Sequence, residues 1–312
     1  MALSRPGLLV LRALGLGDFL TGVPALRALR RAFPDHELVL AAPLAQEPLV
    51  ALGGVADRVL DASGLGPLRW DARPPEVAVN LHGRGPQSHA LLSALSPGRL
   101  VAFGCPEAGH DGPAWRAEEH EVLRWCRLVE EDLCVPADPQ DLGLAAPLSP
   151  AAIPDAVVVH PGAAFAARRW PPDRFAAVGR WAAAQGYPVA VTGGPDEREL
   201  AEEVRRTAGL PSDAVLAGRT DLTELAAQVA TARLLVSGDT GVAHLASAYS
   251  TPSVLLFGPT PPTRWGPPAE GPHAVVWHGD GSGDPWGQEA DPALLRIEVE
   301  EVVAEAQRLL AR

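Results

Sequence analysis

The sequence predicts an α/β protein built from two doubly wound, Rossmann-like domains, each a parallel sheet with helices on both faces. Three observations favour this fold class. Short apolar runs alternate with helical patterns, the alternation stops once at residues 135–154 and then restarts, and 312 residues suffice for two hydrophobic cores. We therefore place an N-terminal domain at residues 1–150 and a C-terminal domain at residues 151–312.

The N-terminal half begins with a buried-strand pattern at residues 8–11, followed by a Gly-containing turn and a helical pattern at residues 20–32. Leu26 and Leu29 share one face of this helix, and Pro24 lies near its first turn, where its missing N–H costs little. The alternation continues with strands expected at residues 37–41, 77–81 and 100–103, and helices expected at residues 45–53, 86–95 and 118–134.

The interruption at residues 135–154 carries five prolines and no convincing periodicity, which is typical of a linker. Two domains facing each other across a cleft would place a ligand between the carboxyl ends of their strands. In the C-terminal half we expect strands at residues 156–159, 188–191, 234–237 and 253–257, helices at residues 172–185, 196–208, 222–230, 242–249 and 299–310, and an acidic loop at residues 279–292.

The charge composition excludes several classes of protein. All 26 basic residues are arginine, and they are outnumbered by 38 acids, which gives a net charge of −12. This balance argues against nucleic-acid binding and allows at most peripheral membrane contact. The chain has no apolar run of about 20 residues and no signal-peptide pattern. Its three cysteines lack C-x-x-C spacing, so we expect a cytoplasmic protein without disulfides.

The first candidate site is the turn Gly15-Leu16-Gly17-Asp18 after the first strand. Its glycines allow a tight turn and close approach to a ligand. Asp18 would either cap the following helix or act as a general base at the mouth of a cleft. A dinucleotide-binding fingerprint fits poorly, because its third glycine position is occupied by Leu20.

Three further loops follow predicted strands in the C-terminal half. His160-Pro161-Gly162-Ala163 leads to Arg168 and Arg169, which would either grip a phosphate through their guanidinium groups or lie solvated at the surface. The second loop, Thr192-Gly193-Gly194, precedes Glu197, which would bind a ribose diol or only favour the helix dipole.

The third loop, Asp239-Thr240-Gly241, links a buried strand to a helix whose free N–H groups form an anion site. His244 lies one helical turn beyond Thr240, where it would contact a phosphate or pack in the core. His160 and His244 lack the paired spacing of a metal site, so we expect no metal ion.

Together these motifs resemble glycosyltransferase family 9, the ADP-heptose heptosyltransferases. Each motif alone is weak, but their order and spacing over residues 8–267 are quite specific. The resemblance rests on Gly17-Asp18 with Pro24-Ala25-Leu26-Arg27-Ala28-Leu29, His160-Pro161-Gly162-Ala163, Arg169-Trp170-Pro171 with Phe175, Gly193-Gly194-Pro195-Asp196-Glu197, Asp239-Thr240-Gly241 with His244-Leu245-Ala246, and Phe257-Gly258-Pro259-Thr260.

The resemblance implies a GT-B architecture and metal-independent, inverting transfer of a heptose or related sugar from an ADP-activated donor to a hydroxyl of a glycan or small-molecule acceptor, without a resident cofactor. It implies that Asp18 is the general base. His82 and Arg84 would bind the acceptor, although the loop that carries them matches the family only loosely. The donor-binding residues that it implies are Gly17, His160, Gly162, Arg168, Arg169, Thr192, Gly193, Glu197, Asp239, Thr240, Gly241 and His244.

The phosphate loop departs from the family, which usually places a lysine there, whereas this chain offers Arg168 or Arg169. Two other functions stay open, a nicotinamide-dependent oxidoreductase and a non-catalytic module that binds nucleotide-sugars. The negative charge also favours a soluble or less anionic acceptor over a phosphorylated lipid core.

Overall fold

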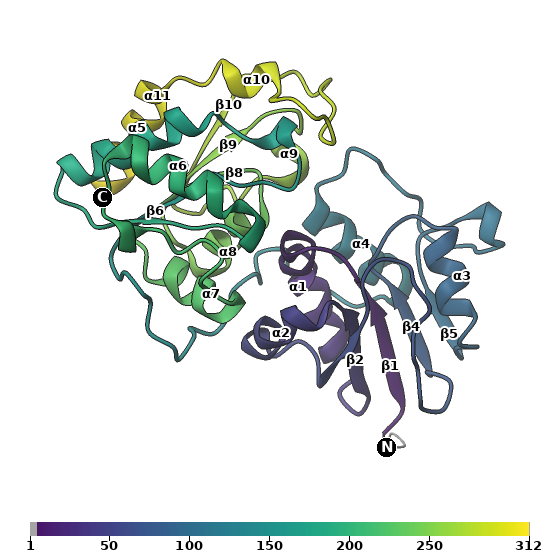
Figure 1. The fold of residues 1–312 in the computed structure, drawn as a ribbon. Coiled ribbons are helices and arrows are strands. Elements are labelled where there is room, and N and C mark those ends of the chain that lie inside the picture. The colour runs from purple at the N-terminus through teal and green to yellow at the C-terminus, as the bar shows by residue number, and fades with distance from the viewer. Residues whose placement is uncertain (1–4, 312) are drawn as a thin grey trace. The chain divides into compact units, whose positions relative to one another are not determined.

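The computed structural model describes residues 5–311 and separates into two compact units, Met1–Leu142 and Gly143–Arg312 (Figure 1). The sequence places the boundary at residue 150, eight residues later. The intervening segment packs with the second unit, since the Leu144 N–H donates to the Ala248 carbonyl at 3.3 Å and the Tyr249 hydroxyl donates to the Ala145 carbonyl at 3.4 Å.

The first unit contains a five-stranded sheet of parallel strands in the order β3-β2-β1-β4-β5. The first strand, β1, lies in the middle of this sheet, with β2 and β3 added on one side and β4 and β5 on the other. The strand order therefore reverses between β1 and β4. The strands are β1 Gly7–Leu11, β2 Glu37–Ala42, β3 Arg58–Asp61, β4 Val77–Asn80 and β5 Arg99–Val101. The helices are α1 Leu16–Ala32, α2 Glu47–Gly53, α3 Gln87–Ser93 and α4 Glu121–Leu133, with short 3₁₀ turns at Leu44–Gln46 and Pro106–Ala108.

The second unit repeats the plan with parallel strands in the order β10-β9-β8-β6-β7, which reverses between β6 and β8. The strands are β6 Val157–His160, β7 Val189–Val191, β8 Leu234–Gly238, β9 Ser253–Phe257 and β10 His273–Trp277. The helices are α5 Pro172–Ala184, α6 Arg198–Ala208, α7 Leu222–Ala230, α8 Gly241–Tyr249, α9 Pro262–Trp265, α10 Pro292–Leu295 and α11 Val299–Leu310, with 3₁₀ turns at Ala166–Arg168, Pro195–Glu197 and Ser212–Ala214.

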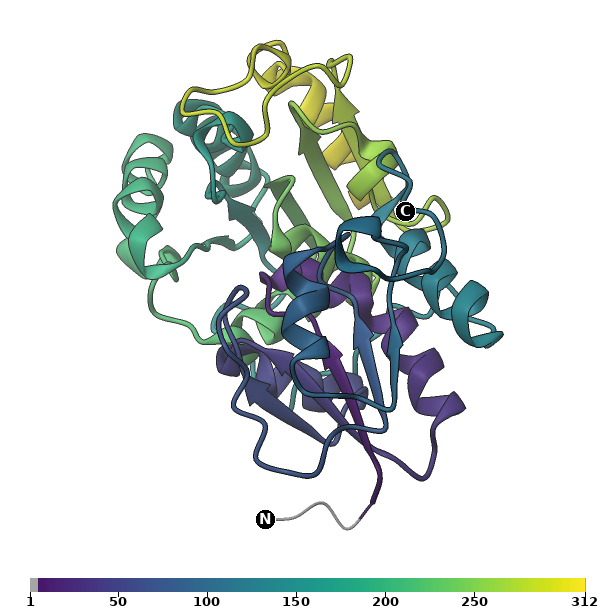
Figure 2. The ribbon, with the colours of Figure 1, turned by 90° about the vertical axis from the view of Figure 1, so that its right-hand side faces the viewer.

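Alternation along the strands divides the core of the second unit into two layers. Val157 and Val159 of β6 belong to a cluster that also contains buried residues of α5, α6 and α11. Leu255 and Phe257 of β9 pack instead with Ala243 of α8. Because successive side chains of a strand point to opposite faces, both faces of the sheet are covered, as its continuous apolar strands require. Figure 2 shows helices flanking the strands of each unit.

The predicted fold class, α/β with two Rossmann-like domains, is confirmed. The sequence reasoning missed β3 and β10, which form edges of the two sheets. Edge strands are partly exposed, and neither strand shows the uninterrupted burial of β1 or β8, so their patterns are weak. None of the helices among residues 5–311 combines the length and the apolar character that crossing a membrane requires.

Candidate functional site

In the first unit, the reversal of strand order brings two predicted loops together. The first turn of α1, which carries Gly17 and Asp18, follows β1, and the loop carrying His82 and Arg84 follows the adjacent strand β4. The helix thus begins at Leu16, earlier than the predicted start at residue 20. Carboxyl ends of parallel strands at such a switch point diverge and leave a crevice that binds ligands. The same point of the fold therefore holds the predicted general base and the predicted acceptor loop.

Asp18 is the third residue of α1, and its Oδ2 accepts the Gly15 N–H at 3.2 Å. The carboxylate thus closes the helix N-terminus, one of the two predicted roles, while its side chain remains 29% exposed. Burial raises the pKa of Asp18, and the nearby Glu121 carboxylate raises it further, whereas the Arg12 guanidinium and the Gly15 N–H lower it. A raised pKa makes the carboxylate a stronger base, which suits proton abstraction near neutral pH.

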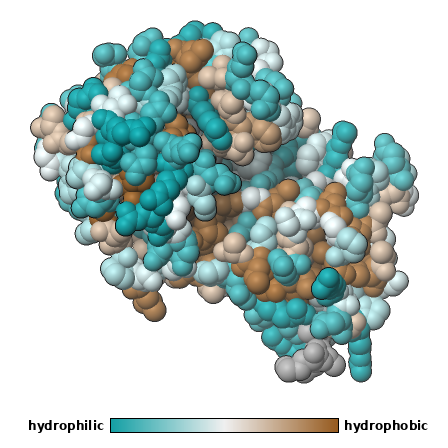
Figure 3. Space-filling view, viewed as in Figure 1, coloured by the Kyte–Doolittle hydropathy of each residue, from teal (hydrophilic) through white to brown (hydrophobic). Residues whose placement is uncertain are grey.

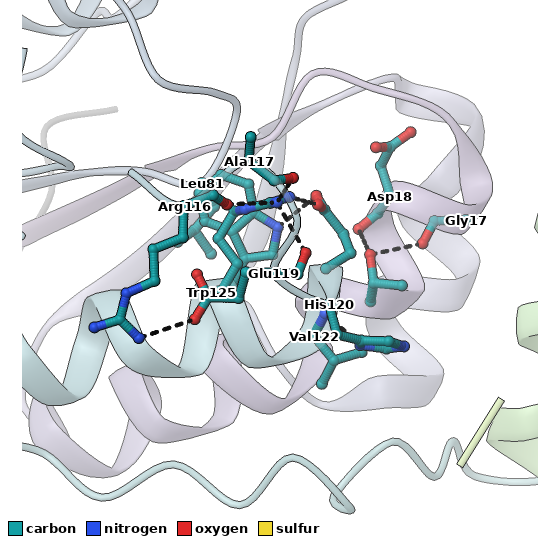
Figure 4. A network of polar contacts seen from close by, with 12 residues as sticks. Gly17, Asp18, Leu81, Arg116, Ala117, Glu119, His120, Val122 and Trp125 are labelled. Atoms are coloured by element: carbon teal, nitrogen blue, oxygen red, sulfur yellow. Dashed lines mark hydrogen bonds and ion pairs between the residues drawn. The ribbon is translucent and has the colours of Figure 1, made fainter. Parts of the chain in front are cut away.

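Arg12, the residue directly after β1, is buried, and Figure 4 labels three residues of the polar network around it, Asp18, Leu81 and Trp125. Its guanidinium donates hydrogen bonds to the main-chain carbonyls of Asp18 and Leu81. It also donates to Thr21 Oγ1 at 2.9 Å and to Glu121 Oε1 at 3.2 Å. The sequence reasoning did not assign Arg12 to the site, although a charged residue at the end of a fully apolar strand was an available signal.

The two predicted acceptor residues have different surroundings. Burial and the positive charge of Arg12 both lower the pKa of His82, and its buried Nδ1 has no hydrogen-bond partner among the described residues. Arg84 is exposed, and its charge lowers the pKa of Glu107, a residue of the turn after β5. His82 therefore belongs with Asp18 and Arg12, while Arg84 extends the site toward the edge of the sheet.

In the second unit, five predicted residues gather where β6 and β7 end. His160 Nδ1 lies 2.9 Å from Thr192 Oγ1, and burial lowers the pKa of this imidazole while the Glu197 carboxylate raises it. Glu197 Oε2 accepts the Gly194 N–H at 2.8 Å. A side chain at Gly162 would overlap the Glu197 carboxylate, so glycine is what lets these two loops meet.

Gly193 belongs to the same group, since a β-carbon there would lie 3.1 Å from Glu197 Cβ. The carboxylate is therefore framed by backbone from the β6 loop and from the β7 loop. This frame fixes one oxygen of Glu197 on the Gly194 N–H, as observed for Asp18 and the Gly15 N–H in the first unit.

The two candidate phosphate-binding arginines, Arg168 and Arg169, have different surroundings in the structure. Arg168 lies close enough to Asp239 for its charge to lower the pKa of that carboxyl, which burial raises to about 6. The backbone of Arg168 covers Gly238 at the end of β8, and its buried Nε has no hydrogen-bond partner among the described residues. Arg169 is exposed and its Nε donates to the Ala163 carbonyl at 2.9 Å.

The predicted anion site corresponds to the start of α8. Thr240 is the N-cap residue, with its hydroxyl 3.1 Å from that of Ser237, and Gly241 begins the helix. Ser237 pairs with His160 across β8 and β6, so this helix start lies at the switch point of the second sheet. His244, in the second turn of α8, packs edge-on against Trp265 with ring centroids 5.9 Å apart.

The predicted residues thus form two groups. Gly17, Asp18, His82 and Arg84 lie in the first unit, and all the other predicted donor residues lie in the second. Among the described residues, no group of three or more His, Cys, Asp or Glu side chains is arranged to hold a metal ion.

The chain was compared with known proteins. Residues 112–281, slightly more than half of the chain, match the family model of glycosyltransferase family 9 (heptosyltransferase). Lipooligosaccharide heptosyltransferase 2 of Haemophilus influenzae is 34% identical over 122 residues, which is 37% of this chain and 34% of that protein. The chain therefore spans about a third of the length of this curated relative.

Solved structures show the same fold. The ADP-heptose lipopolysaccharide heptosyltransferase II of Escherichia coli superposes with a TM-score of 0.77 at 20% identity, covering 98% of each chain. The iron-containing dodecameric glycosyltransferase TibC of enterotoxigenic E. coli superposes with a TM-score of 0.63 at 16% identity, covering 99% of this chain and 76% of that one.

Proposed function

The chain belongs to glycosyltransferase family 9, and from this premise we propose that it transfers a heptose or a related sugar from an ADP-activated donor to an acceptor hydroxyl. The observation that carries the proposal is the helix start at Thr240 and Gly241, directly after β8, with the backbone of Arg168 packed against Gly238 at the end of that strand. This arrangement offers a guanidinium and free helix N–H groups to a diphosphate.

On this proposal the second unit binds the donor. Glu197, framed by Gly162 and Gly193, accepts hydrogen bonds from the nucleotide ribose. Arg168 and the first N–H groups of α8 bind the diphosphate and stabilise the negative charge that develops as ADP departs. The names of the relatives support the choice of donor, since one structural neighbour is an ADP-heptose heptosyltransferase.

The first unit supplies the base. Asp18 removes the proton from the attacking acceptor hydroxyl, and the attack inverts the anomeric carbon because the hydroxyl approaches opposite the departing diphosphate. The raised pKa of Asp18 supports this role, and His82 contacts the acceptor beside it. On this proposal the base and the diphosphate clamp come from different units.

We further propose that the transfer needs neither a metal ion nor a resident cofactor. Arginine and helix N–H groups supply the positive charge that a metal ion supplies in other phosphate sites. A structural neighbour is described as iron-containing, so the point needs a direct test. Transfer rates measured with and without EDTA should agree, and a rate lost to EDTA and restored by a divalent cation would contradict this part of the proposal.

The acceptor is proposed to be a glycan or small molecule that carries fewer anionic groups than a phosphorylated lipid core. The relative from H. influenzae is named for lipooligosaccharide, which supports a glycan. The net charge of −12 argues against a strongly anionic partner.

Donor binding is tested by thermal shift with ADP, UDP, GDP and NADH. We expect ADP to raise the melting temperature most, because binding to the native state alone stabilises it. Stabilisation by NADH without any by ADP would favour an oxidoreductase and contradict the proposed donor.

Catalysis is tested with Asp18→Asn, assayed as release of ADP from ADP-heptose in the presence of a heptose-free core oligosaccharide. Loss of the base should lower kcat by about 100-fold to 10,000-fold with little change in donor affinity. Asp173→Asn is the matched control, because Asp173 also lies in the first turn of a helix but is exposed. Undiminished transfer by Asp18→Asn would show that the base is another group.

A further inference from the structure

The guanidinium of Arg12 is a buried charge with hydrogen-bond partners on several elements of the first unit. Its side chain is fully buried, and burial of an unpaired charge is costly, so its environment must compensate it. It does so with four acceptors from three parts of the unit: the Asp18 carbonyl and Thr21 hydroxyl of α1, the Leu81 carbonyl after β4, and the Glu121 carboxylate of α4.

We propose that Arg12 is a positioning residue for the general base, fixing the first turn of α1 against the acceptor loop. This inference rests on the proposed function, in which Asp18 is the base. The two main-chain carbonyls that Arg12 binds belong to Asp18 itself and to Leu81, the residue before His82. One planar group therefore sets the distance between the base and the loop that faces the acceptor.

The surroundings of Arg12 fix the orientation of its guanidinium. Glu121 Oε1 accepts from Arg12 and also from the Trp125 indole at 2.7 Å, and the other carboxylate oxygen accepts from Arg124. The Trp125 ring lies under the Arg12 guanidinium, 4.9 Å from centroid to Cζ. The planar fork of arginine suits this divided set of acceptors, which a lysine ammonium would not match.

Gly22 leaves the space that the side chain of Arg12 occupies. A β-carbon at this position of α1 would lie 2.9 Å from both Cδ and Nε of Arg12, closer than such atoms approach in proteins. Gly22→Ala would therefore push the guanidinium aside without removing its charge. Alanine also favours a helix interior more than glycine does, so the helix itself is not weakened.

The charges around Asp18 make the positioning role distinguishable from a purely structural one. Arg12, from the end of β1, lowers the pKa of Asp18, and Glu121, from α4, raises it. Arg124 of α4 pairs with Glu121, His120 precedes that helix, and His82 faces Arg12 from the loop after β4. Removing Arg12 and removing Glu121 should consequently shift the titration of Asp18 in opposite directions.

The test compares Arg12→Met, Glu121→Gln and Gly22→Ala in the full chain, with release of ADP from ADP-heptose and a heptose-free core oligosaccharide as the assay. Arg12→Met and Gly22→Ala should lower kcat by about 100-fold with an unchanged donor KM, because a base misplaced by about 1 Å loses that much. The acid limb of kcat/KM should move to higher pH in Arg12→Met and to lower pH in Glu121→Gln. The ¹³C signal of the Asp18 carboxyl should titrate with the same opposite shifts, independently of turnover.

Arg127→Met is the matched control. Arg127 is a buried arginine of α4 that pairs with Glu119 at 2.7 Å and lies over the Phe103 ring, and no contact with Asp18 is found for it. The Arg127→Met substitution should lower the free energy of unfolding but leave the pH dependence of kcat/KM unchanged.

If Arg12→Met does not fold, Gly22→Ala carries the test alone, since it keeps every charge. A Gly22→Ala enzyme with wild-type kcat, or acid limbs that move together in Arg12→Met and Glu121→Gln, would overturn the inference. A wild-type chain that releases no ADP from any ADP-sugar would instead overturn the proposed function, and this inference with it.

Discussion

Arg168 and Arg169 are adjacent in the chain but have different surroundings, and the difference favours one of them as the proposed donor contact. The charge of Arg168 lowers the pKa of Asp239, and its buried Nε has no hydrogen-bond partner among the described residues, whereas Arg169 is exposed and bonded to a loop carbonyl. A sequence without any lysine leaves both arginines open as substitutes for the lysine that the family uses. The structure favours Arg168.

Arg168→Ala should weaken ADP binding by about 10-fold to 100-fold, because hydrogen bonds to charged groups contribute about 1.5–3 kcal/mol. Arg168→Lys should recover part of the loss, since an ammonium restores the charge but not the planar fork. Isothermal titration with ADP measures both variants. Arg169→Ala is the control and should change the dissociation constant only a few-fold, so a larger loss in Arg169→Ala than in Arg168→Ala would reverse the assignment.

The buried carboxyl group of Asp239 should make the stability of the protein depend on pH. Burial raises its pKa from 3.8 to about 6, so the folded chain holds a proton that the unfolded chain releases. The stability contributed by this proton is complete below pH 4 and is lost as pH rises through about 6. Above pH 7 the native state therefore carries a net cost of about 3 kcal/mol for the charged carboxylate, in which the attraction of Arg168 already offsets part of the desolvation.

Asp239→Asn should accordingly stabilise the unliganded protein at pH 8 and have little effect at pH 4. Urea unfolding of the two proteins at several pH values measures the difference in free energy of unfolding. A variant whose advantage is as large at pH 4 as at pH 8 would show that the effect does not come from the charge.

At the scale of elements, the apolar periodicity of the chain identified the central strands and the loops that follow them, and those loops carry both groups of site residues. The central strand β1 was visible because residues 8–11 are all apolar and fully buried. The edge strands β3 and β10 could not be predicted in this way, because their partly exposed residues interrupt the apolar pattern. An apolar pattern in a sequence reflects which residues are buried, so it does not reveal strands that are half exposed.

The network around Arg12 escaped prediction for a different reason. An arginine after a strand usually lies at the surface, and the charge of the buried Arg12 is balanced by the Glu121 carboxylate of α4, more than 100 residues later in the chain. From the sequence alone, Glu121 is predicted only to be an acidic residue in the first turn of a helix, where it interacts favourably with the helix dipole. Only the packing of α4 against α1 makes these two charges a pair.

Gly162 tests how the loops after β6 and β7 cooperate. Gly162→Ala should displace the Glu197 carboxylate and weaken ADP binding by about tenfold, the equivalent of one charged hydrogen bond of about 1.5 kcal/mol. Its backbone angle φ is not in the left-handed region, so the fold should persist. Gly66→Ala is the control, since a β-carbon there meets nothing within 4 Å, and wild-type ADP affinity in Gly162→Ala would exclude Glu197 from the donor site.

At the scale of the whole molecule, the composition has two separate consequences. The absence of lysine matters for the proposed function at one place, the candidate phosphate loop, where Arg168 takes the position that the family gives to a lysine. The excess of acids extends over both halves, and residues 1–152 hold 13 arginines against 18 acids. On the face drawn in Figure 3, the second unit is mainly hydrophilic.

This charge predicts an unusual dependence of the rate on salt. A protein of charge −12 repels an anionic acceptor over distances of about 30 Å at 10 mM salt and of about 8 Å at 150 mM. Raising the salt concentration over this range should therefore increase kcat/KM several-fold for a phosphorylated core oligosaccharide and leave it unchanged for the dephosphorylated one. Steady-state rates with the two acceptors at fixed ADP-heptose measure the effect. A rate that falls with salt on the phosphorylated acceptor would mean that a local basic surface outweighs the net charge, and an anionic lipid core would then become the better acceptor.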